Sequence, residues 1–326
     1  MTILITGAAG FIGYHTAEAL LQRGESVVGV DNLNDYYDVA LKRARLAQLE
    51  AHSGFSFLEA DIADPSAMAP LFGQDDIDRI IHLAAQAGVR FSIESPRSYS
   101  HSNLTGQTEI LELARKLHVK HCVYASSSSV YGSNASIPFK EDDRTDTPVS
   151  FYGATKKACE ILSQSYASLY DLPLTGLRFF TVYGPIGRPD MAYMIFTKKI
   201  LAGETIQVFG EGKMGRDFTY IDDCVAGILG ALDHPPTPAD DPPHRVLNLG
   251  NDRPERLTDF IGLLEKHLGT PAKRELLPMQ PGDVRETWAD ISQAKALFNY
   301  APATSLDDGL GRFARWYLGS GQAAAG

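Results

Sequence analysis

Short apolar runs alternate with helical patterns along the first half of the chain. The run 2–6 reads as a buried strand, and apolar residues recur at helical spacing from Tyr14 to Arg23. A second strand pattern, 26–30, follows, and strands and helices continue to alternate up to about Phe180. This alternation predicts an α/β fold in which a parallel, doubly wound sheet places ligands at the carboxyl edge of its strands.

Beyond Phe180 the regular alternation breaks down. Proline and glycine divide this part of the chain into short segments, at Pro185, Pro189, Gly203, Gly210, Gly212 and Gly215. We therefore expect a smaller mixed α/β domain with several loops. The predicted boundaries are 1–177 for the large domain and 178–320 mainly for the small one, with some segments returning to the first domain. Residues 321–326 are predicted to be a disordered tail.

Composition and charge fit an ordinary globular protein. The chain has 326 residues, of which 44% are hydrophobic and 21% charged. A formal net charge of −10 argues against nucleic acid as a partner, since phosphate binding requires a basic face. Structure that begins at residue 2 or 3 leaves no room for a signal peptide, and no apolar run reaches membrane-spanning length, so we expect a cytoplasmic protein without membrane contact.

The three cysteines and the histidines form no metal-ligand pattern. Cys122, Cys159 and Cys224 are widely spaced in apolar segments, and we interpret them as reduced core residues. No metal site is predicted.

The first strand runs directly into a glycine-rich turn. Gly7, Gly10 and Gly13 are spaced by three and precede a helix, an arrangement that lets a backbone turn and a helix amino end face a pyrophosphate. The second strand ends on Asp31, whose carboxylate can accept both hydroxyls of an adenosine ribose and would repel a 2′-phosphate. The pattern predicts a dinucleotide site that favours NAD over NADP.

A second chemical motif lies at residues 126–156. Four serines, 126–129, precede Tyr152 and Lys156, which share a face if the segment is helical because they are four residues apart. A cation beside a phenol favours the phenolate, so Tyr152 is a candidate general base.

Together these motifs resemble the extended branch of the short-chain dehydrogenase/reductase superfamily, the nucleotide-sugar epimerases and dehydratases. The resemblance covers nearly the whole chain and implies a Rossmann fold with bound NAD. In that family Asp61 and Ile62 lie against the adenine, and small residues after the fourth strand let the cofactor pass. The resemblance implies a cofactor site of Gly7, Gly10, Phe11, Ile12, Gly13, Asp31, Asn32, Asp61, Ile62, Leu83, Ala84, Ala85, Tyr152 and Lys156, and catalytic residues Ser127, Tyr152 and Lys156.

The second domain carries arginines suited to a nucleotide diphosphate. Arg216 lies in a segment similar to the family's Arg-Asp-Phe/Tyr motif, whose arginine makes a bidentate contact with the diphosphate. Arg285 is a second candidate. UDP-galactose 4-epimerases usually carry another arginine upstream, where this chain has Gln280, so the diphosphate contacts must be distributed differently.

The serine strand narrows the reaction. Family dehydratases carry Asp and Glu, and decarboxylases carry Glu, at the positions of Ser128 and Ser129. Without such a carboxylate, elimination lacks its acid and base. Oxidation at C4 followed by return of the same hydride needs neither, which favours a 4-epimerase that keeps its NAD bound.

Segments 31–38, 84–90 and 178–192 are similar to the UDP-glucuronate 4-epimerases in particular. A cluster of hydroxyls could hold the C6 carboxylate of a hexuronate through charge-assisted hydrogen bonds, or could only cap the strand beside a neutral sugar. The resemblance implies that Arg188 lies in a loop near the uridine. The expected substrate-binding residues are Gly88, Val89, Arg90, Ser127, Ser128, Thr181, Arg188, Arg216 and Arg285.

Other interpretations remain open. Within the enzyme class they are a UDP-glucose or UDP-N-acetylhexosamine 4-epimerase and, less favoured, a UDP-glucuronate decarboxylase. Outside it stands a non-catalytic NAD-binding relative. We also expect a homodimer that packs helices from about Asn103 to His118 and about Tyr152 to Tyr170. The apolar residues of these helices, which could equally be ordinary core, are Ile110, Leu111, Leu113, Ala114, Ile161, Leu162, Tyr166 and Leu169.

Overall fold

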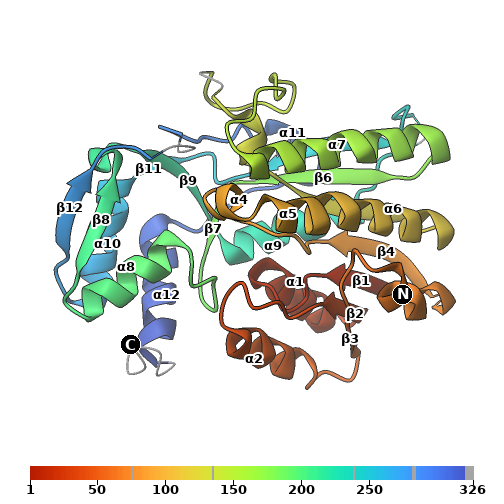
Figure 1. Ribbon diagram of the computed structural model, residues 1–326, viewed down its shortest axis with the longest axis horizontal. Helices are drawn as coiled ribbons and strands as arrows, with labels where there is room; N and C mark the ends of the chain where they lie inside the picture. Colours follow the sequence, from red (N-terminus) through yellow and green to blue (C-terminus); the bar gives the residue numbers. More distant parts are fainter. Residues whose placement is uncertain (75, 134–135, 238, 281–283, 320–326) are drawn as a thin grey trace.

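The computed structural model describes residues 1–74, 76–133, 136–237, 239–280 and 284–319. Helices lie on both faces of one large sheet, and a smaller lobe formed by β8, β12, α8 and α10 stands at one end of it (Figure 1). The predicted tail 321–326 lies outside the described residues.

The large sheet has seven strands in the order β10-β6-β5-β4-β1-β2-β3, and every pairing in it is parallel. The predicted doubly wound parallel sheet is therefore confirmed. Its strands are β1 (Thr2–Thr6), β2 (Ser26–Asp31), β3 (Phe55–Glu59), β4 (Ile77–His82), β5 (His121–Ser127), β6 (Leu174–Phe179) and β10 (His244–Leu249).

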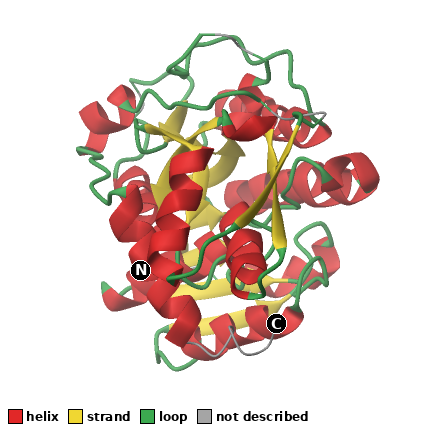
Figure 2. Ribbon diagram, turned by 90° about the vertical axis from the view of Figure 1, so that its left-hand side faces the viewer, coloured by secondary structure: helices red, strands yellow, loops and turns green. Residues whose placement is uncertain are grey.

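Two small sheets build the rest of the molecule. One has the order β11-β9-β7 and the other pairs β12 with β8 in parallel. Figure 2 views the molecule from the side on which the small lobe lies in Figure 1. Their bounds are β7 (Thr181–Tyr183), β8 (Thr205–Phe209), β9 (Gly215–Tyr220), β11 (Pro254–Arg256) and β12 (Lys273–Leu277).

Twelve α-helices occur in the described part of the chain. They are α1 (Phe11–Gln22), α2 (Val39–Leu49), α3 (Pro65–Met68), α4 (Phe91–Glu94), α5 (Pro96–Tyr99), α6 (Gly106–Lys116), α7 (Phe151–Tyr170), α8 (Ala192–Leu201), α9 (Ile221–Asp233), α10 (Leu257–Leu268), α11 (Ser292–Phe298) and α12 (Leu306–Gly319). None of these helices combines the length and the continuous apolar character that crossing a bilayer requires.

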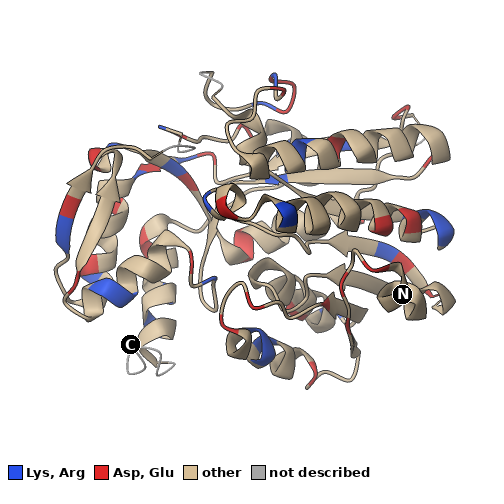
Figure 3. Ribbon diagram, in the orientation of Figure 1, with Lys and Arg blue, Asp and Glu red and all other residues tan. Residues whose placement is uncertain are grey.

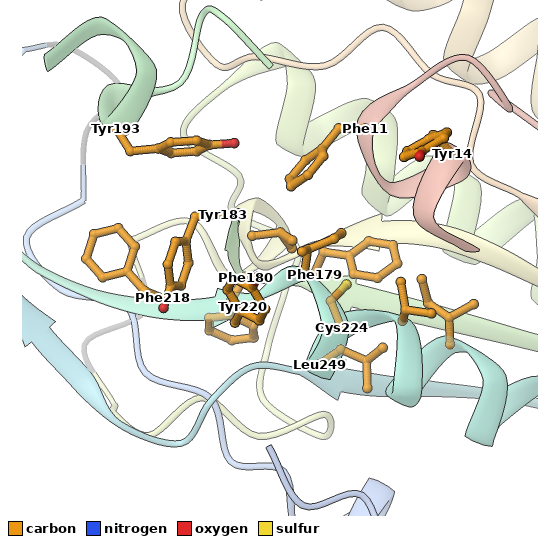
Figure 4. Packing of buried hydrophobic residues seen from close by; sticks show 14 of the residues in the cluster. Phe11, Tyr14, Phe179, Phe180, Tyr183, Tyr193, Phe218, Tyr220, Cys224 and Leu249 are labelled. Atoms are coloured by element: carbon orange, nitrogen blue, oxygen red, sulfur yellow. The ribbon is translucent and has the colours of Figure 1, made fainter. Parts of the chain in front are cut away.

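Burial on both faces explains the continuous apolar strand patterns. All five residues of β1 are buried, with Ile3 and Ile5 in one core cluster and Leu4 in the other, on the opposite face. The first cluster continues into the small lobe through aromatic side chains such as Tyr183 and Phe218, whose ring centroids lie 6.1 Å apart (Figure 4). The two lobes thus share one core.

The helix expected from about Asn103 begins earlier. Helical backbone continues without a break from α5 through a π-helical segment, Ser100–Thr105, into α6 at Gly106. The side chain of Asn103 accepts a hydrogen bond from the backbone N–H of Gln86 and donates to its carbonyl oxygen, at 2.9 and 3.0 Å. These bonds hold the loop after β4 against the π-helical segment.

The three cysteines are buried and form no disulfide, as expected.

Acidic and basic residues are mixed along the outer elements in the view of Figure 3.

Candidate active site

An open cleft runs along the carboxyl ends of β1 to β5. All fourteen residues expected to bind the cofactor line it, together with Ser127 and Arg188. Residues far apart in the sequence therefore meet at the edge where the strand order predicts a ligand.

The glycine-rich turn provides a close backbone surface. Gly7 has a φ of +74°, and a Cβ there would lie 2.7 Å from the backbone nitrogen of Ala84, while a Cβ on Gly13 would overlap the carbonyl oxygen of Gly7. Helix α1 has Gly10 as its N-cap, with no side-chain cap and no acidic residue in its first turn. Its free N–H groups and positive dipole end suit a pyrophosphate.

Asp31 is held in position at the end of β2. Its Oδ2 accepts the backbone N–H of Ala9 at 3.1 Å and its Oδ1 accepts that of Leu33 at 2.9 Å. Burial raises the pKa of this carboxyl, and these hydrogen bonds and the cations Lys42 and Arg45 oppose the rise. A carboxylate oxygen has further lone pairs, so Asp31 can also accept ribose hydroxyls, and the residues present fit NAD.

Asp61 lies at the end of the cleft where the resemblance places the adenosine. Its Oδ2 accepts Asn32 Nδ2 at 3.2 Å and lies 3.1 Å from His101 Nε2, while Oδ1 accepts the N–H of Ala63. Burial raises the pKa of Asp61, but these contacts outweigh it and lower the pKa overall. The carboxylate is therefore ionised.

The opposite end of the cleft holds the expected catalytic residues. Ser150 caps α7 by accepting the N–H of Gly153 at 3.0 Å, so the helix begins just before Tyr152. Lys156, four residues later, is buried, and its Nζ donates to the carbonyl oxygen of Ala125 at 2.9 Å. That contact places the ammonium beside the end of β5, where Ser127 lies.

Neighbouring serines point in different directions because β5 alternates its side chains. The Ser126 hydroxyl donates to Glu160 Oε1 on α7 at 2.6 Å. The Ser127 hydroxyl accepts the N–H of Ser129 at 3.2 Å, where β5 ends and a 3₁₀ turn (Ser128–Tyr131) begins. Ser127 is thus the member of this pair available to a substrate.

Arg188 lies in the cleft wall with a carboxylate already bound. It makes a bidentate contact with Asp190, at 3.0 and 2.6 Å, and Asp190 also accepts the hydroxyl of Tyr36 at 3.1 Å. Burial lowers the pKa of Arg188, but the charge of Asp190 outweighs it and the pKa is raised. The guanidinium is held in place before any substrate binds.

The remaining expected substrate residues lie outside the lining of this cleft. Ser128 directly follows Ser127, and Thr181 lies between two lining residues, Phe180 and Val182. In the small lobe, Arg216 Nη1 donates to the carbonyl oxygen of Arg285 at 3.3 Å, so these two arginines are brought together.

The segment 88–90 approaches the small lobe as well. The carbonyl oxygen of Gly88 accepts the hydroxyl of Tyr99 at 2.5 Å, and Val89 accepts Ser92 Oγ. The guanidinium of Arg90 lies 5.0 Å from the ring centre of Phe209, at the end of β8.

Sequence reasoning missed other lining residues. Most of them lie in segments that carried the family resemblance, so that resemblance held a signal for them: Asn34, Tyr36, Tyr37, Gln86, Ala87, Phe179, Phe180, Val182 and Met191, with Ala125 and Ser126 on the serine strand. No comparable signal marked Lys42, Ala60 and Ser102.

A doubly wound sheet whose dinucleotide cleft ends at a Tyr and Lys on one helix defines the NAD-dependent enzymes of the extended short-chain dehydrogenase/reductase type. A profile of the NAD dependent epimerase/dehydratase family matches residues 3–250. The chain belongs to this family.

Individual relatives agree with the family. UDP-glucuronate 4-epimerase 2 from Arabidopsis thaliana is 50% identical over 331 residues, covering 98% of this chain and 76% of the relative. The crystal structure of UDP-glucuronic acid 4-epimerase from Bacillus cereus, in complex with UDP-glucuronic acid and NAD, is 37% identical with a TM-score of 0.89, covering 98% and 100% of the two chains. UDP-glucose 4-epimerase from Thermotoga maritima, with UDP-glucose, is 31% identical with a TM-score of 0.86, covering 98% and 99%.

Proposed function

We propose that this protein is an NAD-dependent 4-epimerase that interconverts UDP-glucuronate and UDP-galacturonate through a 4-keto intermediate. The observation that carries the proposal is the distribution of acids in the cleft. Among its described lining residues the carboxylates are Asp31 and Asp61, both at the adenosine end. The sugar end offers hydroxyls and cations but no acid–base pair for elimination, whereas hydride removal and return need only one base.

The reaction assigns a role to each residue at the sugar end. Bound NAD supplies the acceptor, and later the donor, of the C4 hydride. Tyr152 removes the O4 proton while that hydride leaves, and Lys156 stabilises the phenolate. Ser127 holds O4 as it becomes a carbonyl oxygen. After the keto sugar rotates, Tyr152 returns the proton to O4 and the hydride returns to the opposite face of C4.

The choice of a uronate rests on hydroxyls and on relatives. Ser127 in the cleft lining, with Ser128 and Thr181 adjacent to lining residues, supplies donors for the C6 carboxylate. Once C4 is a ketone, the carboxylate is β to it and prone to leave as CO2. Binding that keeps the breaking bond out of line with the carbonyl π system protects the intermediate. The Arabidopsis and Bacillus relatives bear the name of this activity.

A panel of UDP-sugars incubated with the purified enzyme tests the proposal, with Tyr152→Phe as the matched control. Mass spectrometry and chromatography should show UDP-galacturonate forming from UDP-glucuronate without net NADH. Preference for UDP-glucose or a UDP-N-acetylhexosamine would replace the uronate assignment by a neutral-sugar epimerase. UDP-4-keto-pentose with NADH as the main product would indicate a decarboxylase, and no product from any sugar would indicate a non-catalytic relative.

We further propose a cytoplasmic homodimer in which α7 contributes the interface. Part of the expected apolar face is core, because four residues of α6 are at most 1% exposed, namely Ile110, Leu111, Leu113 and Ala114. On α7, by contrast, Ile161 is 60% exposed and Leu169 68%, eight residues apart and so on one face. An apolar stripe of this kind favours burial against a second copy. Light scattering at micromolar concentration should give twice the mass of one chain, and Ile161→Glu should reduce it to one.

A further inference from the structure

Arg45, on α2, is a buried cation outside the catalytic set. It is completely inaccessible to solvent, and its four terminal N–H groups each have an acceptor. These acceptors are Ala9 O at 2.8 Å, Tyr37 Oη at 2.7 Å, Ile186 O at 2.7 Å and Gly187 O at 3.1 Å. Its Nε has no hydrogen-bond partner.

None of these acceptors is a carboxylate. A buried charge is costly unless it is paired or fully hydrogen-bonded, and Arg45 is compensated by three backbone carbonyl dipoles, one hydroxyl and the more distant charge of Asp31. The planar guanidinium fork can reach acceptors in two separate segments at once, which a single ammonium does less well. Its geometry therefore suits a role in joining segments.

One of those segments is the turn that leads to Arg188. Three successive carbonyls in it accept hydrogen bonds from the large domain. His15 Nε2 donates to Pro185 O at 3.1 Å, and Arg45 donates to the carbonyl oxygens of Ile186 and Gly187. Ile186 has a φ of +55°, an unfavourable region for a β-branched residue. This conformation persists because both neighbouring peptides are held.

The other segment is the glycine-rich turn. Ala9 lies between Gly7 and Gly10, its N–H donates to Asp31 and its carbonyl accepts from Arg45. One guanidinium thus contacts the backbone that faces the pyrophosphate and the backbone that precedes Arg188. The relative position of these two walls of the cleft is set through Arg45.

We propose that Arg45 is a positioning residue of the reaction, which holds the turn 184–187, and with it Arg188, at a fixed position against the cofactor-binding turn. The consequence for uronate binding rests on the proposed function, whereas the consequence for the loop does not. Without Arg45, the strained turn relaxes and Arg188 loses its fixed place in the cleft wall. The UDP-sugar then binds more weakly although Tyr152, Lys156 and Ser127 are untouched.

The test compares Arg45→Met and Arg45→Lys with wild type, and uses Arg43→Met, an exposed arginine two residues earlier on the same helix, as control. Hydrogen-exchange mass spectrometry of the full chain with saturating NAD and no sugar follows the peptide that spans 180–191. Steady-state kinetics with UDP-glucuronate then separate KM from kcat. Circular dichroism and thermal unfolding establish that each variant is folded.

We expect Arg45→Met to speed hydrogen exchange in 184–191. It should also raise KM roughly tenfold or more, which corresponds to the loss of one or more charge-assisted hydrogen bonds. The fall in kcat should be smaller than the rise in KM, and Arg43→Met should match wild type. If Arg45→Met does not fold, Arg45→Lys decides in its place. Wild-type exchange and wild-type KM in the deciding variant would overturn the proposal. If wild type itself does not epimerise UDP-glucuronate, the proposed function fails while the exchange comparison still tests the loop contact.

Discussion

Replacing Glu160 by Gln tests the buried ion pair behind the catalytic residues. Glu160 and Arg178 have side chains that are each 3% exposed, and Arg178 contacts both carboxylate oxygens, at 2.8 and 3.0 Å. Oε1 also accepts Ser126 Oγ. Burial raises the pKa of Glu160, but the hydrogen bonds and charge of Arg178 outweigh it and lower the pKa overall, so the pair is ionised.

Glutamine keeps the shape of the Glu160 side chain but removes its negative charge. It also directs an NH2 group at hydrogen-bond donors that the carboxylate accepted, those of Arg178 or Ser126. Arg178 is then left buried without its counter-charge, a change that costs about 3–5 kcal/mol. With an unfolding entropy of roughly 2.1 cal/mol/K per residue, a chain of 326 residues loses about 1.5 °C of melting temperature per kcal/mol, so a fall of about 4–7 °C is expected. Because Glu160 lies one turn beyond Lys156 on α7, and Ser126 precedes Ser127, turnover should fall as well.

Thermal unfolding at a fixed, saturating NAD concentration measures the effect. Lys157→Met is the control, since Lys157 contacts the same carboxylate at 3.2 Å from a more exposed position, and such a pair contributes at most about 1 kcal/mol. Glu160→Leu combined with Arg178→Met should recover part of the loss, because an apolar pair leaves no buried charge. A melting temperature for Glu160→Gln equal to that of the control would refute the reasoning.

Three further predictions concern the reaction and pH. Tyr152→Phe should lower turnover by at least about 10²–10⁴-fold with nearly unchanged NAD and UDP-sugar affinity in titrations, and near-normal turnover would exclude it as the base. Ser128→Ala and Thr181→Ala should each weaken the binding of UDP-glucuronate relative to that of UDP-glucose by about ten- to a hundredfold, and should release some UDP-4-keto-pentose with NADH. Equal losses of affinity for both sugars would contradict a carboxylate contact. Burial lowers the pKa of His82 to about 3 and of His121 to about 4, so the stability from these neutral histidines is present above pH 6.5 and lost as pH falls toward 4. Urea unfolding should therefore show a free energy of unfolding that falls by up to about 1.4 kcal/mol per pH unit for each histidine, and a constant value between pH 6.5 and 4.5 would refute this.

The cofactor half of the cleft was predictable because its contacts are local in sequence. A strand, a glycine turn and a helix follow one another, and Asp31 closes the next strand, so residue type and spacing already define the geometry. The Tyr152 and Lys156 pair was predictable for the same reason, since one helix carries both.

Contacts between distant segments were not predictable in this way. Arg45 resembles any helix arginine in the sequence, while its partners Ala9 and Ile186 lie 36 and 141 residues away. The apolar stripe on α6 looked the same whether its partner was this chain or a second copy, and only the packing shows that Ile110 is core. Periodicity identifies a buried face but not what covers it.

The position of β10 has a consequence for how the protein is made. This strand covers the open edge of β6, yet it is synthesised only after all the residues from β7 to α9. Until Leu249 has left the ribosome, β6 presents unpaired backbone groups and a fully buried sequence, Leu174–Phe179, as a free edge. The nascent chain therefore passes through a stage in which β6 can pair with strands of other chains. Expression at low temperature or with added chaperone should improve the yield of folded protein.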